Sequence, residues 1–406
     1  MDTWPPPTDE QAELIDLVAR LGRERFEPRA RRWDRDAIFP TDNYDDLRAA
    51  GLLALCIPKE HGGLGADLRT YCLVAAELGR WCATTALTFN MHSSAMLWSG
   101  PLADEVEMTP PERAGHNERR ARHYCRVVDQ AALYAQPFSE GATSASGRDP
   151  FGTTATPVEG GWLVNGRKVF ASLSGAATHY GVLCTETGAG QEELDPRNTL
   201  YVAVPADSPG FAITGEWDPL GMRGTVSRTL EFHDVFVPDG EQLLPRGVYF
   251  RAAIEGPYMF FTLAPTYVGL ATASDEFTVD YLRGEVDGEA RVRRSSPTKQ
   301  LAVAEMRIKL EQLRSLFDRV IAEAHVSPGR DERIRMLAAN YTIMEGANDL
   351  CRLAIRTCGG HSIQRRFPLE RYYRDSRCGS LMLPFTAEIC LERIGRDALY
   401  QPGERD

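Results

Sequence analysis

Cysteine and histidine are residue types that can bind a metal or attack a substrate, but their spacing in this sequence favours neither role. The nine cysteines are odd in number and no two of them form a Cys-x-x-Cys pair, so neither a zinc site nor a disulfide framework is predicted. The eight histidines are scattered, and His92 and His361, which lie in apolar surroundings, are typical of hydrogen-bonded structural residues. No metal is assigned.

Four motifs that would fix a reaction class are also missing. The sequence contains no GxGxxG after a strand, no GxxxxGK[ST], no HExxH and no GxSxG. The sequence therefore gives no support for a nicotinamide-dependent enzyme, a nucleotide hydrolase, a zinc peptidase or an α/β-hydrolase.

The elements that must position any site begin with helices. Thr8 is a predicted N-cap with Gln11 three residues later, and apolar residues follow at helical spacing. Further amphipathic helices are predicted over residues 42–50, 67–80 and 85–98. The first third of the chain is therefore expected to be helical.

A β region follows these helices. Short apolar runs flank Asn165-Gly166, and because this pair tolerates the positive φ of a type I′ turn, it predicts a hairpin. Residues 228–238 predict a pair of strands that turns at His233-Asp234. The β region is expected to end near Pro245.

Helical periodicity returns in the last third of the chain. Three long apolar stripes predict a helical bundle whose third helix ends at Gly359-Gly360. The expected fold class is α+β, with an N-terminal helical domain at residues 1–132, a middle β-barrel or β-sandwich domain at 133–245, and a C-terminal four-helix bundle at 246–406.

Charge and hydropathy narrow the choice of partners. The chain has 406 residues, with 46 Lys and Arg against 57 Asp and Glu, and a net charge of −11 argues against a general nucleic-acid binder. Its apolar runs fall far short of the roughly 18 residues that a membrane span needs. Because the first residues also lack the features of a secretory signal, we expect a cytoplasmic protein with reduced cysteines and no nucleic-acid or membrane partner.

Four sequence strings carry a more particular likeness. They are AAGLLALCIPKEHGGLGADLRTY at residues 49–71, GWLVNGRKVFASLSGAATHYGVL at 161–183, WDPLGMRGTVSRTLEFHDVFVP at 217–238 and RTCGGHSIQRRFPLERYYRDSRCG at 356–379. In this order the strings closely resemble the acyl-CoA dehydrogenase superfamily, and the likeness covers nearly the whole chain.

The resemblance implies an FAD-dependent oxidoreductase and the residues that hold the flavin. In the family the flavin lies between the β domain and the C-terminal bundle. Phe138 and Ser139 match residues that bond the flavin edge, Phe170 and Ser172 match the aromatic and hydroxyl residues near the ring and its N5 atom, and Thr386 is a further cofactor contact. A hydroxyl donor near N5 makes physical sense, because reduction builds negative charge on the ring and a fixed dipole aimed there tunes its potential.

Three other matched positions imply an oligomer. Gln300, Arg356 and Gly360 correspond to residues that reach the adenosine half of FAD in a neighbouring subunit. The resemblance therefore implies a homodimer or, following the family's habit of pairing dimers, a homotetramer.

The catalytic base that the resemblance implies is missing. Family members remove the α-proton of an acyl thioester with a Glu in a dry pocket, eight residues after the Asp that here is Asp375. That count gives Leu383, and the position used by some relatives instead is Met259. Glu255, one helical turn before Met259, and Glu388 are the candidate bases, although each also fits an ordinary helix-terminal carboxylate.

The substrate side of the site follows from the same resemblance. The helix over residues 85–100 corresponds to a wall of the acyl cavity, where Met91 and His92 supply bulk that predicts a shallow pocket. Packing of the helix core explains both residues equally well. Met259 and Leu383 are the other predicted substrate contacts, and the sequence leaves open whether the thioester is carried by CoA or by a carrier protein.

Three functions remain open on this basis. The leading hypothesis is α,β-dehydrogenation of an acyl thioester, with electron-transfer flavoprotein as the electron acceptor. The second is a decarboxylating dehydrogenase or a monooxygenase of a natural-product pathway. Its β-keto or malonyl-type substrate would yield an enolate without a base, and its reduced flavin would react with O2. The third is a non-catalytic partner subunit that has kept the fold.

Overall fold

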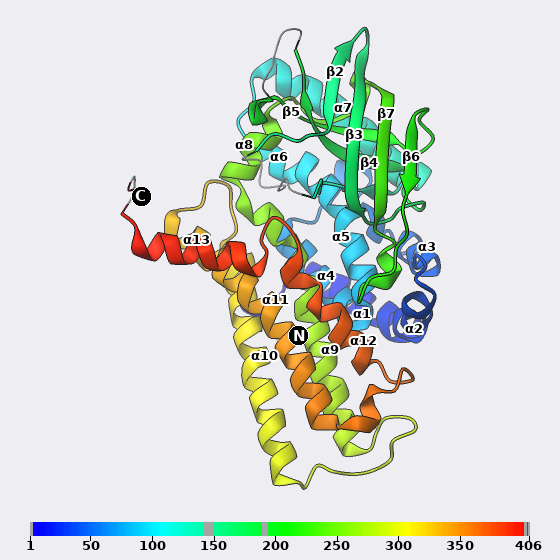
Figure 1. Cartoon of the computed structure of the whole chain (residues 1–406), viewed down its shortest axis with the longest axis vertical. Helices are drawn as coiled ribbons and strands as arrows, with labels where there is room; N and C mark the ends of the chain where they lie inside the picture. The colour runs from blue at the N-terminus through cyan, green and yellow to red at the C-terminus, as the bar shows by residue number, and fades with distance from the viewer. Residues whose placement is uncertain (1–2, 142–148, 189–193, 402–403, 405–406) are drawn as a thin grey trace.

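A computed structural model of the chain shows three parts, which are helical, then β, then helical (Figure 1). It describes residues 3–141, 149–188, 194–401 and 404. The sheet lies at one end of the molecule and the long C-terminal helices extend away from it. Most N-terminal helices lie beside the place where the two meet, while the last ones, residues 103–130, lie at the end with the sheet. The expected α+β fold class is confirmed.

The N-terminal part consists of helices whose ends the sequence marks. The Thr8 side chain accepts a hydrogen bond from the Gln11 backbone while the Gln11 side chain binds back to Thr8, which completes the predicted capping box. Helices α4 and α5 are buried along most of their length and form the centre of this part. The helices are α1 (Asp9–Leu21), the π-helical η1 (Gly22–Phe26), α2 (Glu27–Asp36), α3 (Thr41–Ala49), α4 (Leu68–Trp81), α5 (Ala83–Leu97), the π-helical η4 (Trp98–Leu102), α6 (Ala103–Glu105) and α7 (Pro110–Gln130).

The middle part is one eight-stranded sheet. Its strand order is β6-β7-β3-β2-β4-β5-β8, and β1 pairs in parallel with β4. Strands β2 and β3 form an antiparallel hairpin whose last pair is Val158 with Gly161. The strands are β1 (Tyr134–Ala135), β2 (Thr154–Val158), β3 (Gly161–Ala171), β4 (His179–Glu186), β5 (Thr199–Pro205), β6 (Phe211–Thr214), β7 (Arg228–Pro238) and β8 (Gln242–Leu244).

Two turns predicted from the sequence are wrong, and the same feature explains both. Asn165-Gly166 lies inside β3 and His233-Asp234 lies inside β7, and both strands continue through these positions. The register of β3 against β7 shifts at Gly166, where the Asn165 amide donates to Asp234 Oδ1 at 2.9 Å. The positive φ angles of Gly166 and Asp234, 142° and 50°, therefore belong to a β-bulge and not to turns.

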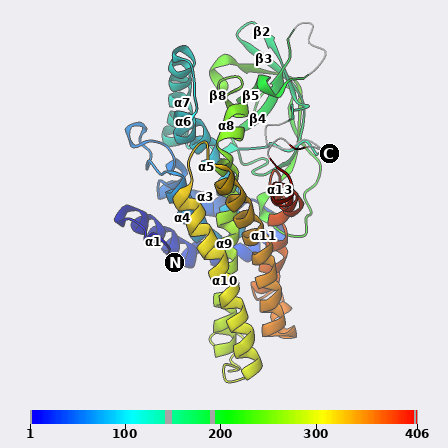
Figure 2. The same ribbon diagram turned by 90° about the vertical axis from the view of Figure 1, so that its left-hand side faces the viewer.

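The C-terminal part is a bundle built on three long helices. Helices α9, α10 and α11 run alongside one another, and α4 of the N-terminal part packs against α9 (Figure 2). Among the described residues, no helix combines the length and the apolar character that crossing a membrane requires. The elements are α8 (Val248–Glu255), the 3₁₀-helical η8 (Pro257–Leu263), α9 (Ala264–Arg283), α10 (Pro297–Glu323), α11 (Arg330–Cys358), α12 (Leu369–Arg377), the 3₁₀-helical η10 (Gly379–Leu381) and α13 (Ala387–Leu399).

The three parts are joined at α12. Both terminal guanidinium nitrogens of Arg374 bind Asp34 of α2, at 2.8 and 2.7 Å, and one of them also donates to Leu220 O at 3.1 Å. The neighbouring Asp375 accepts a hydrogen bond from Met222 N at 2.6 Å, and burial raises its pKa to about 6. The loop between β6 and β7 is therefore held against both helical parts.

Candidate functional site

The first two predicted flavin segments lie side by side in the structure. Val169 N in β3 donates to Ser139 O at 2.8 Å, so the segment that ends at Ser139 runs next to the strand that carries Phe170. The ring of Phe138 stacks on Trp98, with centroids 5.3 Å apart, and packs against the core. Ser139 itself stays partly exposed.

Phe170 presents its ring to solvent from a strained backbone. Its side chain is 68% exposed, and its φ of 55° lies in the left-handed region that a bulky residue rarely adopts. The ring meets Trp217 edge-on, with centroids 6.3 Å apart. An exposed aromatic ring held in this way is typical of a surface that a ligand covers.

Three hydroxyl groups form a chain next to this strand end. Ser172 Oγ lies 2.8 Å from Ser227 Oγ, which lies 2.7 Å from Thr225 Oγ1, and Thr225 Oγ1 donates to Met222 O at 2.9 Å. Because a carbonyl oxygen only accepts, the Thr225 hydrogen is used there, so Ser227 donates to Thr225 and Ser172 donates to Ser227. Ser172 Oγ is left with its lone pairs for a ligand, so the expectation of a donor hydroxyl at this position is wrong: its only hydrogen is used by Ser227.

The two loops that carry these hydroxyls hold each other in an unusual conformation. Leu173 N donates to Thr225 O at 3.0 Å and Ser174 N to Val226 O at 3.2 Å. Leu173 and Val226 have φ angles of 63° and 47°, of which the second is a marked outlier for a β-branched residue. Such strain persists where surrounding structure enforces it, and it is concentrated at ligand sites.

An exposed ring, an acceptor hydroxyl and a preformed backbone together fit the flat face and polar edge of a flavin.

The segment between η10 and α13, where the base was expected, is apolar. Residues 381–386 contain no carboxylate, histidine or cysteine, and Leu383 is partly buried. Phe385 packs edge-on against Phe260 with centroids 5.6 Å apart, and Phe260 packs against Trp98 at 5.8 Å. With Phe138 stacked on Trp98, four aromatic rings form a continuous chain through the interior, and this set is called the aromatic chain below.

The two candidate bases lie outside dry surroundings. Glu255 is the last residue of α8, where its carbonyl accepts a hydrogen bond from Ser327 N at 2.7 Å, and its side chain is partly exposed. Glu388 is exposed in the first turn of α13, a helix that Thr386 caps by accepting from Ile389 N at 3.3 Å. Solvent reaches both carboxylates, so neither one lies in the dry pocket that the resemblance implies for the base.

The predicted substrate residues of α5 and η8 have different surroundings. His92 Nε2 donates to Leu53 O at 2.8 Å, and its Nδ1 accepts from Tyr134 N at 3.1 Å, so no ring nitrogen is left for a ligand. Burial lowers the pKa of His92 to about 4, which keeps the ring neutral. Met259 is buried and Met91 is half-buried against the core.

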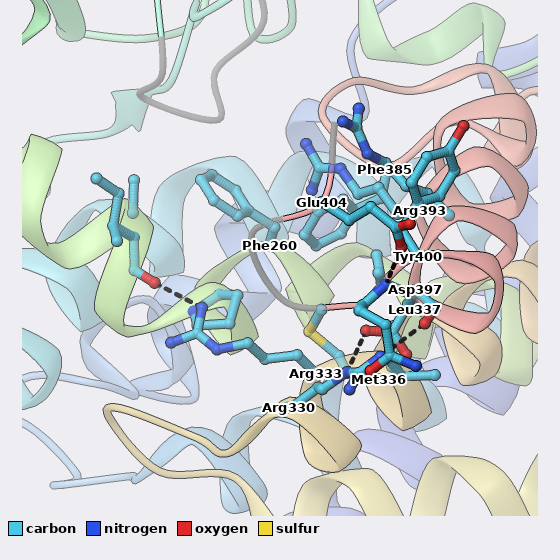
Figure 3. Close-up of a pocket in the computed structure, with 16 residues that line it drawn as sticks. Phe260, Arg330, Arg333, Met336, Leu337, Phe385, Arg393, Asp397, Tyr400 and Glu404 are labelled. Carbon is cyan, nitrogen blue, oxygen red and sulfur yellow. Dashed lines mark hydrogen bonds and ion pairs between the residues drawn. The ribbon is translucent and has the colours of Figure 1, made fainter. Parts of the chain in front are cut away.

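A pocket of about 740 Å³ opens beside the aromatic chain, between η8, α11 and α13 (Figure 3). Its apolar floor includes Phe260 and Phe385, and its rim carries four arginines, Arg330, Arg333, Arg393 and Arg396, with Asp397 and Glu404 as the acidic residues. The sequence analysis missed this pocket, because arginines more than 50 residues apart on two helices each have the pattern of a solvated surface.

The rim arginines are held by different partners. Arg330 Nε binds Asp397 Oδ1 at 2.5 Å, which ties α11 to α13, and Arg333 donates to Ile254 O at 2.7 Å. The guanidinium of Arg396 lies 5.5 Å from the centre of the Tyr400 ring. With four arginines against two carboxylates, the rim carries excess positive charge and favours a ligand with an anionic group.

The residues expected to reach a neighbour's cofactor lie far from this site. Gln300 and Arg356 are at the start of α10 and the end of α11, at the tip of the bundle remote from the sheet, and Gly360 follows directly (Figure 1). There a polar pocket of about 520 Å³ contains Arg293 and Lys299 beside Gly360. Within one chain the structure does not bring these residues together with Phe170.

Comparison with known proteins gives three matching domain models that together span most of the chain. The acyl-CoA dehydrogenase N-terminal domain matches residues 8–103, the middle domain residues 138–235 and the C-terminal domain residues 261–399. The resemblance inferred from the four strings is thereby confirmed.

Individual relatives include both acyl-CoA dehydrogenases and nitrososynthases. L-evernosamine nitrososynthase of a Micromonospora species is 27% identical and aligns over 100% of this chain and 94% of its own. The human mitochondrial short-chain specific acyl-CoA dehydrogenase is 26% identical over 90% of this chain and 84% of its own. The solved structure of KijD3 with FMN and a dTDP-linked 3-amino-4-keto sugar is 25% identical, with a TM-score of 0.82 and coverage of 99% and 96%.

Proposed function

This chain belongs to the acyl-CoA dehydrogenase family, and from that premise we propose that it is a flavin-dependent monooxygenase and not an α,β-dehydrogenase. The observation that carries the proposal is the apolar segment 381–386 facing Phe260. Removal of an α-proton needs a base within hydrogen-bond reach of the carbon, and the described residues of this segment supply none. The nitrososynthase relative supports a reaction other than desaturation.

The chemistry that a bound, reduced flavin supplies is activation of O2, so that one oxygen atom goes to the substrate and the other leaves as water after two electrons and two protons are taken up. Phe170 would cover the flavin ring and Ser172 Oγ would accept a hydrogen bond from its edge. The aromatic chain, with Leu383 beside it, would exclude bulk water from the reacting atoms, which prevents unproductive loss of the activated oxygen.

The arginine-rimmed pocket is the proposed substrate site. Its apolar floor touches the aromatic chain through Phe260 and Phe385, while its rim offers guanidinium groups that suit phosphate or carboxylate. The dTDP-linked sugar in the KijD3 structure supports a phosphate-bearing substrate. We propose that the anionic part is bound at the rim and the part to be oxidised lies against the floor.

FAD is the proposed flavin, and a homodimer or homotetramer the proposed assembly. Support comes from the basic pocket around Arg293 and Lys299, which would suit the pyrophosphate of a neighbour's FAD. The nine cysteines, all of them in the described part of the chain and all free thiols, support a reducing cytoplasmic location. Chromatography of the flavin released by heat separates FAD from FMN, and light scattering gives the oligomeric mass.

The proposed function is tested by comparing two half-reactions on the purified protein. Under anaerobic conditions, butyryl-CoA and malonyl-CoA should leave the visible band of the oxidised flavin unchanged. After chemical reduction and admission of O2, a dTDP-linked amino sugar should be converted into a product that carries one additional oxygen atom. Bleaching by butyryl-CoA would instead establish the dehydrogenase. The variant Leu383→Glu is the matched control, because it places a carboxylate where the family has its base.

A further inference from the structure

A buried pair of opposite charges lies between the two flavin segments. Lys168 in β3 is 0% exposed, and its Nζ lies 2.6 Å from Oε1 of Glu140, whose side chain is 9% exposed. Glu140 directly follows Ser139, and Lys168 lies two residues before Phe170. The proposed reaction uses neither of these charged groups.

The Glu140 carboxylate is a junction of several chain segments. In addition to Lys168, its Oε1 accepts from Thr153 N at 2.9 Å and its Oε2 from Gly152 N at 2.7 Å. Burial alone would raise the pKa of Glu140, but Lys168 and Thr153 lower it below its usual value. The Lys168 ammonium also lies 4.5 Å from the centre of the Phe151 ring. Glu140 therefore has three hydrogen-bond donors around it, and Lys168 has the Glu140 carboxylate and the Phe151 ring as its partners.

A buried ion pair is a poor device for stability alone. Removing two charges from water costs about as much as their attraction returns, and apolar side chains of similar size often serve as well or better. A charged pair does fix geometry, since each partner tolerates only a narrow range of positions. Here it ties the segment before β2 and the strand β3 to the residue that follows Ser139, and Val169 N reinforces that tie by donating to Ser139 O at 2.8 Å.

We propose that Lys168 and Glu140 are positioning residues that set the separation between Ser139 and Phe170 and so preform the flavin site. This inference rests on the proposed function only in requiring that a flavin binds at these two segments. Disturbing the pair lets the two segments move apart, and the cofactor must then restore their arrangement with part of its binding energy.

The test is a double-mutant cycle on flavin affinity. The full-length protein is stripped of flavin and titrated with FAD and, separately, with FMN, by fluorescence quenching, for wild type, Lys168→Met, Glu140→Gln and the double variant. Each single change should weaken binding about tenfold, and the double change also about tenfold instead of about a hundredfold, because the second change removes a partner already lost. The matched control is Arg246→Met, which breaks a surface ion pair of 2.6 Å with Glu186 in the same sheet region; it should change the affinity by less than about twofold.

The same measurements separate the possible outcomes. If the variants lower the melting temperature of the apoprotein but share the wild-type flavin affinity and absorption band shape, the pair is structural only and the inference is overturned. If Lys168→Met does not fold, the double variant decides, because it buries no unpaired charge, and wild-type affinity in it overturns the inference. If wild type binds neither FAD nor FMN, the proposed function is overturned, and this inference with it.

Discussion

Replacing His92 with Gln should change how the stability of the folded protein depends on pH. His92 is buried in α5, with one ring nitrogen donating to Leu53 O at 2.8 Å and the other accepting from Tyr134 N at 3.1 Å. A proton on Nδ1 would displace the Tyr134 hydrogen bond and put a charge into the core. The folded protein therefore resists protonation of His92, while the unfolded chain does not.

The size of the effect follows from the pKa. Burial lowers the pKa of His92 from 6.5 to about 4, and since one pKa unit corresponds to about 1.4 kcal/mol, the difference amounts to about 3 kcal/mol. Because the pKa of His92 is lower in the folded protein than in the unfolded chain, acid destabilises the folded protein. The contribution to stability is fully present above pH 6.5, where both states are neutral, and it is lost as the pH falls through 6.5 toward 4 and the unfolded state takes up the proton.

Urea unfolding of wild type and His92→Gln at several pH values between about 7 and 4 measures this contribution. Wild type should be the more stable at neutral pH, and its advantage should shrink by about 3 kcal/mol toward pH 4. The difference between the two proteins is the quantity to follow, because burial raises the pKa of Asp275 and of Asp375 to about 6 and the two carboxyls act in the opposite direction. His233→Gln, at a side chain 75% exposed, is the control and should change stability by less than about 0.5 kcal/mol. An advantage that stays constant with pH would refute the reasoning.

Three further substitutions test other parts of the structure. Arg374→Met leaves the mostly buried Asp34 unpaired and should lower the free energy of unfolding by about 3 kcal/mol in urea titrations. A loss below about 1 kcal/mol would show that this ion pair does not hold α12 against α2. Ser227→Ala removes the acceptor of the Ser172 hydrogen, which can then donate to the flavin, and should shift the ratio of affinities for oxidised and reduced FAD by about fivefold toward the oxidised form. An unchanged ratio would show that Ser172 does not donate to Ser227. Arg396→Gln should raise KM for a phosphate-bearing substrate about fivefold with kcat nearly unchanged, and a loss confined to kcat would remove the rim from substrate binding.

The sequence could predict most helices because their signals are local. The Thr8 capping box and the glycines after α11 act within a few residues of the helix ends they define. The prediction failed at Asn165-Gly166, where the same left-handed tendency that makes a type I′ turn also makes a β-bulge. Only the opposite strand distinguishes the two cases, since the Asn165 amide binds Asp234 at 2.9 Å across 69 residues of sequence.

The candidate site was predictable only in part. Resemblance of the strings identified the segments of Ser139 and Phe170, and the structure places these segments next to each other. The strain at Phe170 and the direction of the hydroxyl chain are properties of backbone angles and donor geometry, which residue types do not encode. The arginine-rimmed pocket arises from two helices that meet only in the folded chain, so no short motif records it.

The residues proposed to hold a flavin and the residues proposed to select the reaction come from different elements. Phe170 and the hydroxyl chain belong to the sheet and its loops, whereas the proposed reacting side consists of η8 and residues 381–386. A sequence can therefore lose the family's carboxylate at Leu383 without disturbing the cofactor frame. The α-proton that must leave an acyl thioester during dehydrogenation would then have no acceptor in this segment, whereas oxygen transfer would take up two protons, which end in the water that is formed. Under the proposed function, the apolar residue at position 383 is the feature that would favour oxygen transfer over dehydrogenation in this chain.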